Sequence, residues 1–104
     1  MGPGRADLLE LIQATGSIAA AGRQMGMSYK RAWALVEAMN GLFRAPVVEA
    51  VKGGAGGGGA HLTETGLQVL HAYRGLEAAS VRAGAAFLTE LDAALAVSRR
   101  RKDA

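Results

Sequence analysis

The sequence predicts a mainly α-helical protein with one small β-hairpin. Three observations support this fold class. Two short amphipathic segments, 18–25 and 29–43, are joined by a tight turn at Gly26. A β-branched run and a glycine run follow them, as in a hairpin. A long apolar stripe of helical spacing then begins after Thr63. This order is that of a winged helix-turn-helix followed by a long C-terminal dimerisation helix.

The composition argues for one small domain without catalytic chemistry. The chain has 104 residues, no Cys and a net charge of +3, so one core is all that it can build. The lack of Cys excludes disulfides, a thiol nucleophile and Cys-ligated zinc. His61 and His71 are not spaced as a helical metal pair, so we expect no metal and no cofactor. No Ser/His/Asp grouping or carboxylate pair suggests an enzyme.

Targeting and membrane signals are also missing from the sequence. The longest nearly uncharged run, 81–91, is far shorter than the roughly 20 residues of a membrane span. The N-terminus has no apolar block before Leu8, so we infer no signal peptide. We therefore expect a cytoplasmic protein without a membrane partner.

The first three helices are indicated by apolar spacing and by capping residues. A first helix of about two turns around Leu8–Ile12 is expected to end at Gly16. Ser17 is placed as the N-cap of the second helix, which Gly26 ends. Ser28 is the N-cap candidate of the third, which runs from about Tyr29 to Phe43 and buries Ala32, Val36, Met39 and Phe43.

The segment after Pro46 is predicted to form the hairpin, or wing. Residues 47–51 form the first strand and 61–63 the returning strand, while 53–59 contain six glycines in seven positions. No Lys follows Gly59, so the glycines are not a phosphate loop of the Walker type. We interpret them as a mobile tip whose backbone, with Lys52 at its base, can lie close to a phosphate backbone.

The last third of the chain is predicted to be one helix, from Thr63 to about residue 97. Roughly 30 residues of helix span about 45 Å, more than the preceding domain can cover. The part of this helix that the domain cannot cover is expected to pack against the same helix of a second copy of the chain. We therefore divide the chain into a DNA-binding domain (1–63, net +2), a dimerisation helix (64–98, net −2) and a basic tail (99–104, net +3).

The first turn of the third helix carries the candidate DNA contacts. Polar and basic residues stand where a recognition helix meets base edges and phosphates. Trp33, three positions after Lys30, has two interpretations: it faces the DNA beside Lys30, or it packs into the core. The predicted contacts of this helix are Ser28, Tyr29, Lys30, Arg31 and Trp33.

The chain also resembles a known family. Its segments TGSIAAAGRQMGMSYKRAW (15–33), VEAMN (36–40), VVEA (47–50) and GGAGGGGAHLT (53–63) are similar to the DNA-binding domain of the molybdate-responsive ModE regulators. That domain is related to the LysR-type winged helix. The resemblance implies a homodimer that binds double-stranded DNA, with Ser17 contacting phosphate and with Lys52, Gly53 and Gly54 of the wing following the DNA backbone.

The sequence departs from the family pattern in ways that bear on function. It ends at Ala104 without the segment that binds molybdate in family members, so we do not expect this chain to bind molybdate directly. Ala50 and Ala55 replace an Arg and a basic residue often found in the family, so wing contacts are expected to rely on the backbone. Its tail adds a basic cluster of its own.

Two functional hypotheses remain from the sequence. The first is a ModE/LysR-like transcription regulator that binds duplex operator DNA as a homodimer and is linked to molybdate-dependent gene control. The alternative is a helical protein–protein interaction module, or a dimeric partner of a full-length regulator. The charge of the surface across Lys30, Arg31 and Lys52 discriminates between them: a basic surface supports DNA binding, and an acidic one counts against it.

Overall fold

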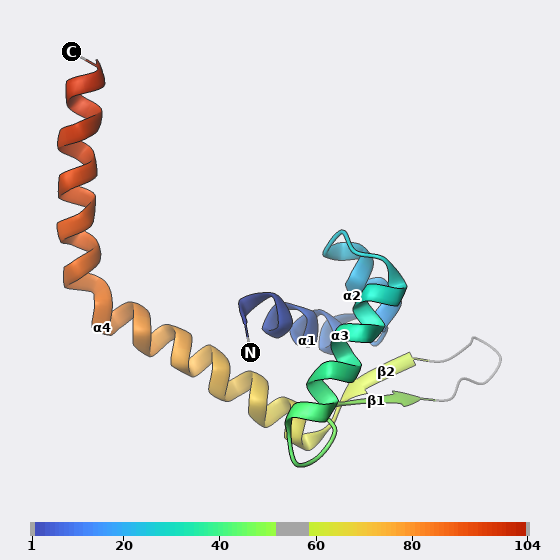
Figure 1. The fold of residues 1–104 in the computed structure, drawn as a ribbon. Coiled ribbons are helices and arrows are strands. Elements are labelled where there is room, and N and C mark those ends of the chain that lie inside the picture. The colour runs from blue at the N-terminus through green and yellow to red at the C-terminus, as the bar shows by residue number, and fades with distance from the viewer. Residues whose placement is uncertain (1, 52–58, 104) are drawn as a thin grey trace. The chain divides into compact units, whose positions relative to one another are not determined.

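The computed structural model describes residues 2–51 and 59–103, and it divides into two compact units (Figure 1). The first unit is Met1–Tyr73 and the second is Arg74–Ala104. The elements are, in chain order, α1 (Pro3–Thr15), α2 (Ile18–Gln24), α3 (Tyr29–Leu42), β1 (Val48–Val51), β2 (Gly59–Leu62) and α4 (Glu64–Asp103). This is a winged helix-turn-helix with a long C-terminal helix, as the sequence predicts.

Helix α1 begins earlier than its apolar spacing predicts. It starts at Pro3, where a fixed φ and a missing N–H suit the first helical turn. It ends, as expected, at Gly16, which has a φ of 70° in the left-handed region. The side chains of Leu8, Leu9 and Ile12 are fully buried and provide much of the core.

Helices α2 and α3 form the helix-turn-helix, and both expected caps are present. Ser17 Oγ accepts a hydrogen bond from the Ala20 amide at 3.0 Å, and Ser28 Oγ accepts one from the Arg31 amide at 3.1 Å. Gly26, with a φ of 72°, lies in the turn between the helices. A Cβ at Gly22 would lie 2.9 Å from the Cβ of Ala32, so glycine permits the close approach of α2 and α3.

The hairpin is a two-stranded antiparallel sheet in which Val48 pairs with Leu62 and Val51 with Gly59. The returning strand therefore starts earlier than predicted, and Thr63 lies beyond it. The Ala60 amide donates to the Gly16 carbonyl at 2.9 Å, which joins β2 to the turn between α1 and α2. Residues 52–58, with the predicted wing contacts Lys52, Gly53 and Gly54, lie outside the described residues.

The start of α4 belongs to the first unit, whose core it helps to cover. Leu70 is buried with the core residues of α1–α3 and the hairpin. Thr63 caps the helix by accepting from the Gly66 amide at 3.0 Å and donates to the Pro46 carbonyl at 2.6 Å. A Cβ at Gly66 would collide with the carbonyl oxygen of Val47, so this position needs glycine.

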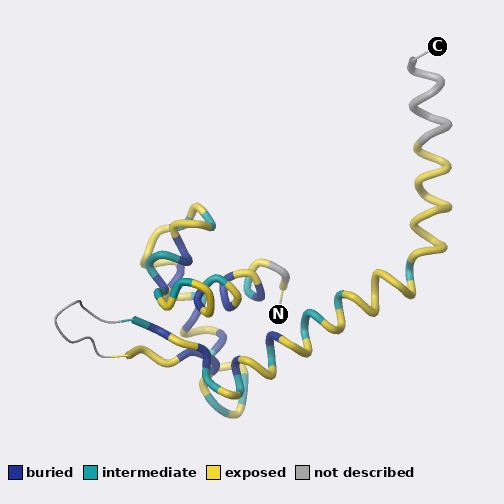
Figure 2. The backbone as a smooth tube through the Cα atoms, turned by 180° about the vertical axis from the view of Figure 1, so that it is seen from behind, coloured by how far each residue is buried: buried dark blue, intermediate teal, exposed yellow. Residues whose placement is uncertain are grey.

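The second unit is a single helical segment, the part of α4 from Arg74 to Asp103. The helix continues past its expected end near residue 97 and includes residues 99–103 of the predicted tail. Between 75 and 95 almost every residue is exposed (Figure 2). Large apolar side chains are among them, namely Leu76, Val81, Phe87, Leu88, Leu91 and Leu95.

Candidate nucleic-acid interface

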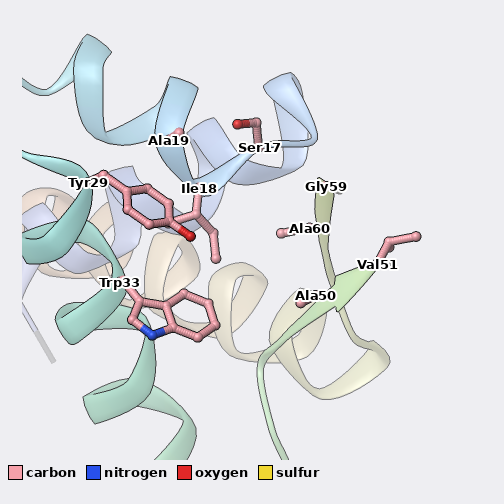
Figure 3. A pocket seen from close by; sticks show the side chains of 9 residues that line it. All are labelled: Ser17, Ile18, Ala19, Tyr29, Trp33, Ala50, Val51, Gly59 and Ala60. Carbon is pink, nitrogen blue, oxygen red and sulfur yellow. The ribbon is translucent and has the colours of Figure 1, made fainter. Parts of the chain in front are cut away.

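A hollow of about 360 Å³ lies beside the start of α3 (Figure 3). Three elements form it: residues 17–19 at the start of α2, Tyr29 and Trp33 on α3, and residues 50–51 and 59–60 of the hairpin. Three of the predicted DNA contacts therefore meet in one place, although Ser17 is distant in sequence from the other two. The hairpin provides the third side of this surface.

Tyr29 and Trp33 form the α3 side of the hollow. Their positions in the sequence differ by four, so they lie on the same face of the helix. Tyr29 is 59% exposed and Trp33 is 37% exposed, and neither belongs to the buried core. Of the two interpretations of Trp33, the structure therefore places it at the surface, with its ring beside Tyr29 and Ile18 (Figure 3).

Ser17 contributes the one side-chain hydroxyl on the α2 side. Its oxygen accepts the hydrogen bond from the Ala20 amide, which fixes the oxygen and leaves the hydroxyl hydrogen able to donate. The residue is half-buried, and its amide is held by Thr15 Oγ1 at 3.2 Å. The cap that starts α2 thus also places a donor at the edge of the hollow.

The remaining predicted contacts on α3 lie outside the hollow. Ser28, Lys30 and Arg31 are exposed but do not line it. Successive residues of an α-helix differ in direction by about 100°. Lys30 and Arg31 therefore point to different sides of α3, and only Lys30 lies on the flank next to Tyr29 and Trp33.

The hairpin side of the hollow consists of residues that sequence reasoning did not select. Ala50, Val51, Gly59 and Ala60 line it. A Cβ at Gly59 would lie 2.8 Å from the Gly16 carbonyl oxygen, so β2 rests directly against the turn before α2. The small residues on either side of the glycine run were the only sign in the sequence of this side of the hollow. Where they lie depends on the pairing of the two strands, which the sequence did not predict in detail.

The described charged residues of α3 and of the hairpin do not line the hollow. Lys30 and Arg31 are exposed on α3, and Glu37 is exposed farther along the same helix. On the hairpin, Glu49 and His61 are cross-strand neighbours whose carboxylate and imidazole lie 3.5 Å apart. Among the described residues, none that lines the hollow carries a charge.

Other kinds of site are not found in the part of the chain that the structure describes. It contains no group of three or more His, Cys, Asp or Glu side chains arranged to hold a metal ion. Within the same residues, no helix is both long enough and apolar enough to cross a bilayer.

Comparison with known proteins relates the chain to ModE regulators and to molybdenum-pterin-binding proteins. The chain is 54% identical over 78 residues to the molybdenum-pterin-binding protein MopB of Rhodobacter capsulatus, covering 75% of this chain and 29% of that protein. It is 46% identical over 71 residues to the transcriptional regulator ModE of Yersinia pestis, covering 68% of this chain and 27% of the relative. No protein-family model matches the chain.

Over these residues the chain is a homologue of the ModE regulators. The resemblance inferred from the sequence is thus confirmed. The DNA-binding transcriptional dual regulator ModE of Escherichia coli (strain K12) shows 42% identity over 71 residues, which are 68% of this chain and 27% of ModE. The chain spans less than a third of the length of the curated relatives that it matches. What ModE and MopB do as whole proteins is therefore a matter for proposal here.

Proposed function

We propose that the chain is a transcription regulator that binds duplex DNA through α3 and the hairpin. The observation that carries this proposal is the exposed first turn of α3, where Tyr29, Lys30, Arg31 and Trp33 face solvent. In helix-turn-helix proteins the second helix enters the major groove with its N-terminal residues against base edges. Here that helix is capped by Ser28 and flanked by the hairpin, as in a winged domain.

The directions in which the side chains of α3 point suggest different roles for its two cations. Lys30 points away from the buried face of α3, which carries Ala32, Val36 and Met39, so it is the cation placed to contact base edges. Arg31, about 100° away, is placed to contact a phosphate at the side of the groove. Ser17 contributes a phosphate contact through its hydroxyl. Lys52, Gly53 and Gly54 extend the proposed interface along the DNA backbone.

The second unit is proposed to dimerise with the same segment of another copy. Val81, Leu88 and Leu95 recur every seven residues, and Gly84 and Leu91 fall between them at the spacing of a two-helix seam. The apolar side chains of this seam are more than half exposed, so pairing removes them from water. A two-fold dimer matches a two-fold symmetric operator.

The relatives suggest the regulatory setting. One is named molybdenum transport protein ModE, of Azotobacter vinelandii, and is 44% identical over 73 residues. We propose that this chain takes part in molybdenum-linked gene control, with molybdate bound elsewhere than in these residues. The alternative, a protein–protein interaction module, is favoured only by the exposed apolar face of the second unit. It does not account for the basic start of α3.

A selection from random duplex DNA with the purified chain tests DNA binding. We expect a recovered site with two-fold symmetry and a binding constant that falls steeply with salt, since cations contact phosphates. Gel shifts of the recovered site against a scrambled duplex measure the specificity. Recovery of no enriched sequence, with the chain binding protein partners instead, would favour the interaction module.

A further inference from the structure

The hollow beside α3 has a chemical character that differs from the rest of the proposed interface. Lys30 and Arg31 are close in sequence to its aromatic residues, yet the described residues that line it are uncharged. The α2 and α3 sides carry two hydroxyls and an indole ring, while the hairpin side is made mainly of alanine and glycine (Figure 3). An occupant that fits must therefore carry hydrogen-bond acceptors on one part and apolar surface on another.

The position of the hollow restricts that occupant further. In helix-turn-helix complexes the first helix crosses the DNA backbone while the second lies in the major groove. The hollow lies where the start of α2 meets the start of α3, so the backbone is the part of the DNA that reaches it. A sugar–phosphate unit has acceptor oxygens and an apolar sugar face, which are the two properties required.

We propose that the uncharged residues described for this hollow form a seat for one sugar–phosphate unit of the DNA backbone. The hydroxyls of Ser17 and Tyr29 donate hydrogen bonds to phosphate oxygens, and the ring of Trp33 packs against the deoxyribose. The side chains of Ala50 and Ala60 on the hairpin are small, so they leave room for the DNA backbone to enter the hollow. This inference rests on the proposed function, because it names a subsite of the same interface.

The seat differs in a measurable way from the cationic contacts. A Lys or Arg that neutralises a phosphate releases counterions, and each such contact adds about 0.9 to the slope of log affinity against log salt. None of the described residues of the seat is a cation, so the hydrogen bonds donated by Ser17 and Tyr29 release no counterions and their contribution to affinity does not depend on salt. It also reads no base, so its contribution is the same for every DNA sequence.

The first test uses Tyr29→Phe in the full chain, which removes the hydroxyl and keeps the ring. We expect affinity to fall about three- to tenfold, the range of one net hydrogen bond. The loss should be equal for the selected operator and for a scrambled duplex, with an unchanged salt slope. Tyr73→Phe is the matched control, because Tyr73 lies on α4 outside the hollow, and it should bind as wild type.

The second test fills the seat. Ala50→Leu places a larger side chain at an exposed position of the hollow, so the fold should be retained while the backbone is excluded. We expect a larger loss than for Tyr29→Phe, again on both duplexes. Ala72→Leu, at an exposed position of α4, is the matched control. Circular dichroism and thermal unfolding confirm that the variants are folded.

The outcomes separate the seat from the proposed function. Wild-type affinity in both Tyr29→Phe and Ala50→Leu would overturn the seat alone, provided that Lys30→Ala weakens binding. A loss confined to the operator, and removed when thymines are replaced by deoxyuridine, would show that the hollow reads a base and would also overturn the seat. Failure of the wild-type chain to bind any duplex would overturn the proposed function and the seat with it.

Discussion

The side chain of Asn40 on α3 forms hydrogen bonds with both backbone groups of Val48, the first residue of β1. Its Nδ2 donates to the Val48 carbonyl and its Oδ1 accepts from the Val48 amide, each at 3.1 Å. The same oxygen accepts from the Val47 amide at 2.8 Å. These three hydrogen bonds connect the C-terminal part of α3 to the start of β1. They therefore fix the position of the hairpin relative to that helix.

Asn40→Ala should lower the free energy of unfolding by about 1–3 kcal/mol, because the half-buried backbone groups of Val47 and Val48 lose their partner. Urea titration followed by circular dichroism measures the change. Gln13→Ala, which removes an exposed amide on α1, should change the free energy by much less. Equal stabilities of the two variants would show that Asn40 does not hold the hairpin.

Gly66→Ala should destabilise the first unit, because its Cβ would collide with the Val47 carbonyl oxygen and push the start of α4 from the hairpin. We expect a loss of at least about 1–3 kcal/mol in the free energy of unfolding. Gly41→Ala is the matched control on α3, where nothing lies within 4 Å of the added Cβ. That variant should be as stable as wild type or more stable by up to about 1 kcal/mol. The prediction is wrong if both substitutions lower the free energy of unfolding to the same extent.

Lys30→Ala combined with Arg31→Ala should abolish specific DNA binding and leave the fold intact, because both side chains are exposed. The single variants should differ. Lys30→Ala is expected to relax base preference, and Arg31→Ala to weaken all sequences alike and reduce the salt slope. Gel shifts on the selected operator and on its single-base variants measure both effects. Unchanged affinity of the double variant would contradict the placement of α3 in the major groove.

If two copies pair through the proposed seam of the second unit, its charges predict the direction of the pairing. Arg82 lies near its N-terminal end, whereas Glu90 and Asp92 lie near its C-terminal end. An antiparallel pair places Arg82 near Asp92 of the partner subunit and Gly84 opposite Leu88. A parallel, in-register pair keeps Arg82 and Asp92 at different levels along the two helices, so it brings no such opposite charges together. We therefore expect the antiparallel arrangement.

Arg82→Glu should weaken the dimer by a few-fold, the effect expected of exposed charges, and Arg82→Glu with Asp92→Arg should restore it. Sedimentation equilibrium at low salt measures the dissociation constants, and Arg23→Glu, on α2, controls for net charge. Leu88→Glu should dissociate the dimer outright. A dimer that survives Leu88→Glu would show that another surface joins the copies.

Features set by neighbouring residues were predictable from the sequence. Ser17 and Ser28 cap their helices through bonds that span three residues, and Gly16 and Gly26 adopt positive φ in the turns where they were expected. The start of α1 was missed because residues 3–7 lack apolar periodicity, although Ala6 is fully buried. Small buried residues leave little trace in a hydropathy pattern.

Features that depend on distant residues were not predictable. The contact of Asn40 with Val48 requires the path of the chain around Pro46, and the contact of Ala60 with Gly16 spans most of the first unit. Trp33 lies on the flank of α3, between its buried and exposed faces, so periodicity alone left both interpretations open. The hollow exists only because three separate elements meet, and no single stretch of sequence encodes it.

The close approach of Gly22 to Ala32 and of Gly59 to the Gly16 carbonyl has a consequence for how such a protein can diverge. At these points a single added methyl group disturbs the framework, so most mutations there are expected to be lost. Lys30, Arg31 and Ala34 are exposed on α3, and replacing them changes few internal contacts. Duplicated copies of such a gene could therefore acquire new binding sites much faster than they could acquire a new shape.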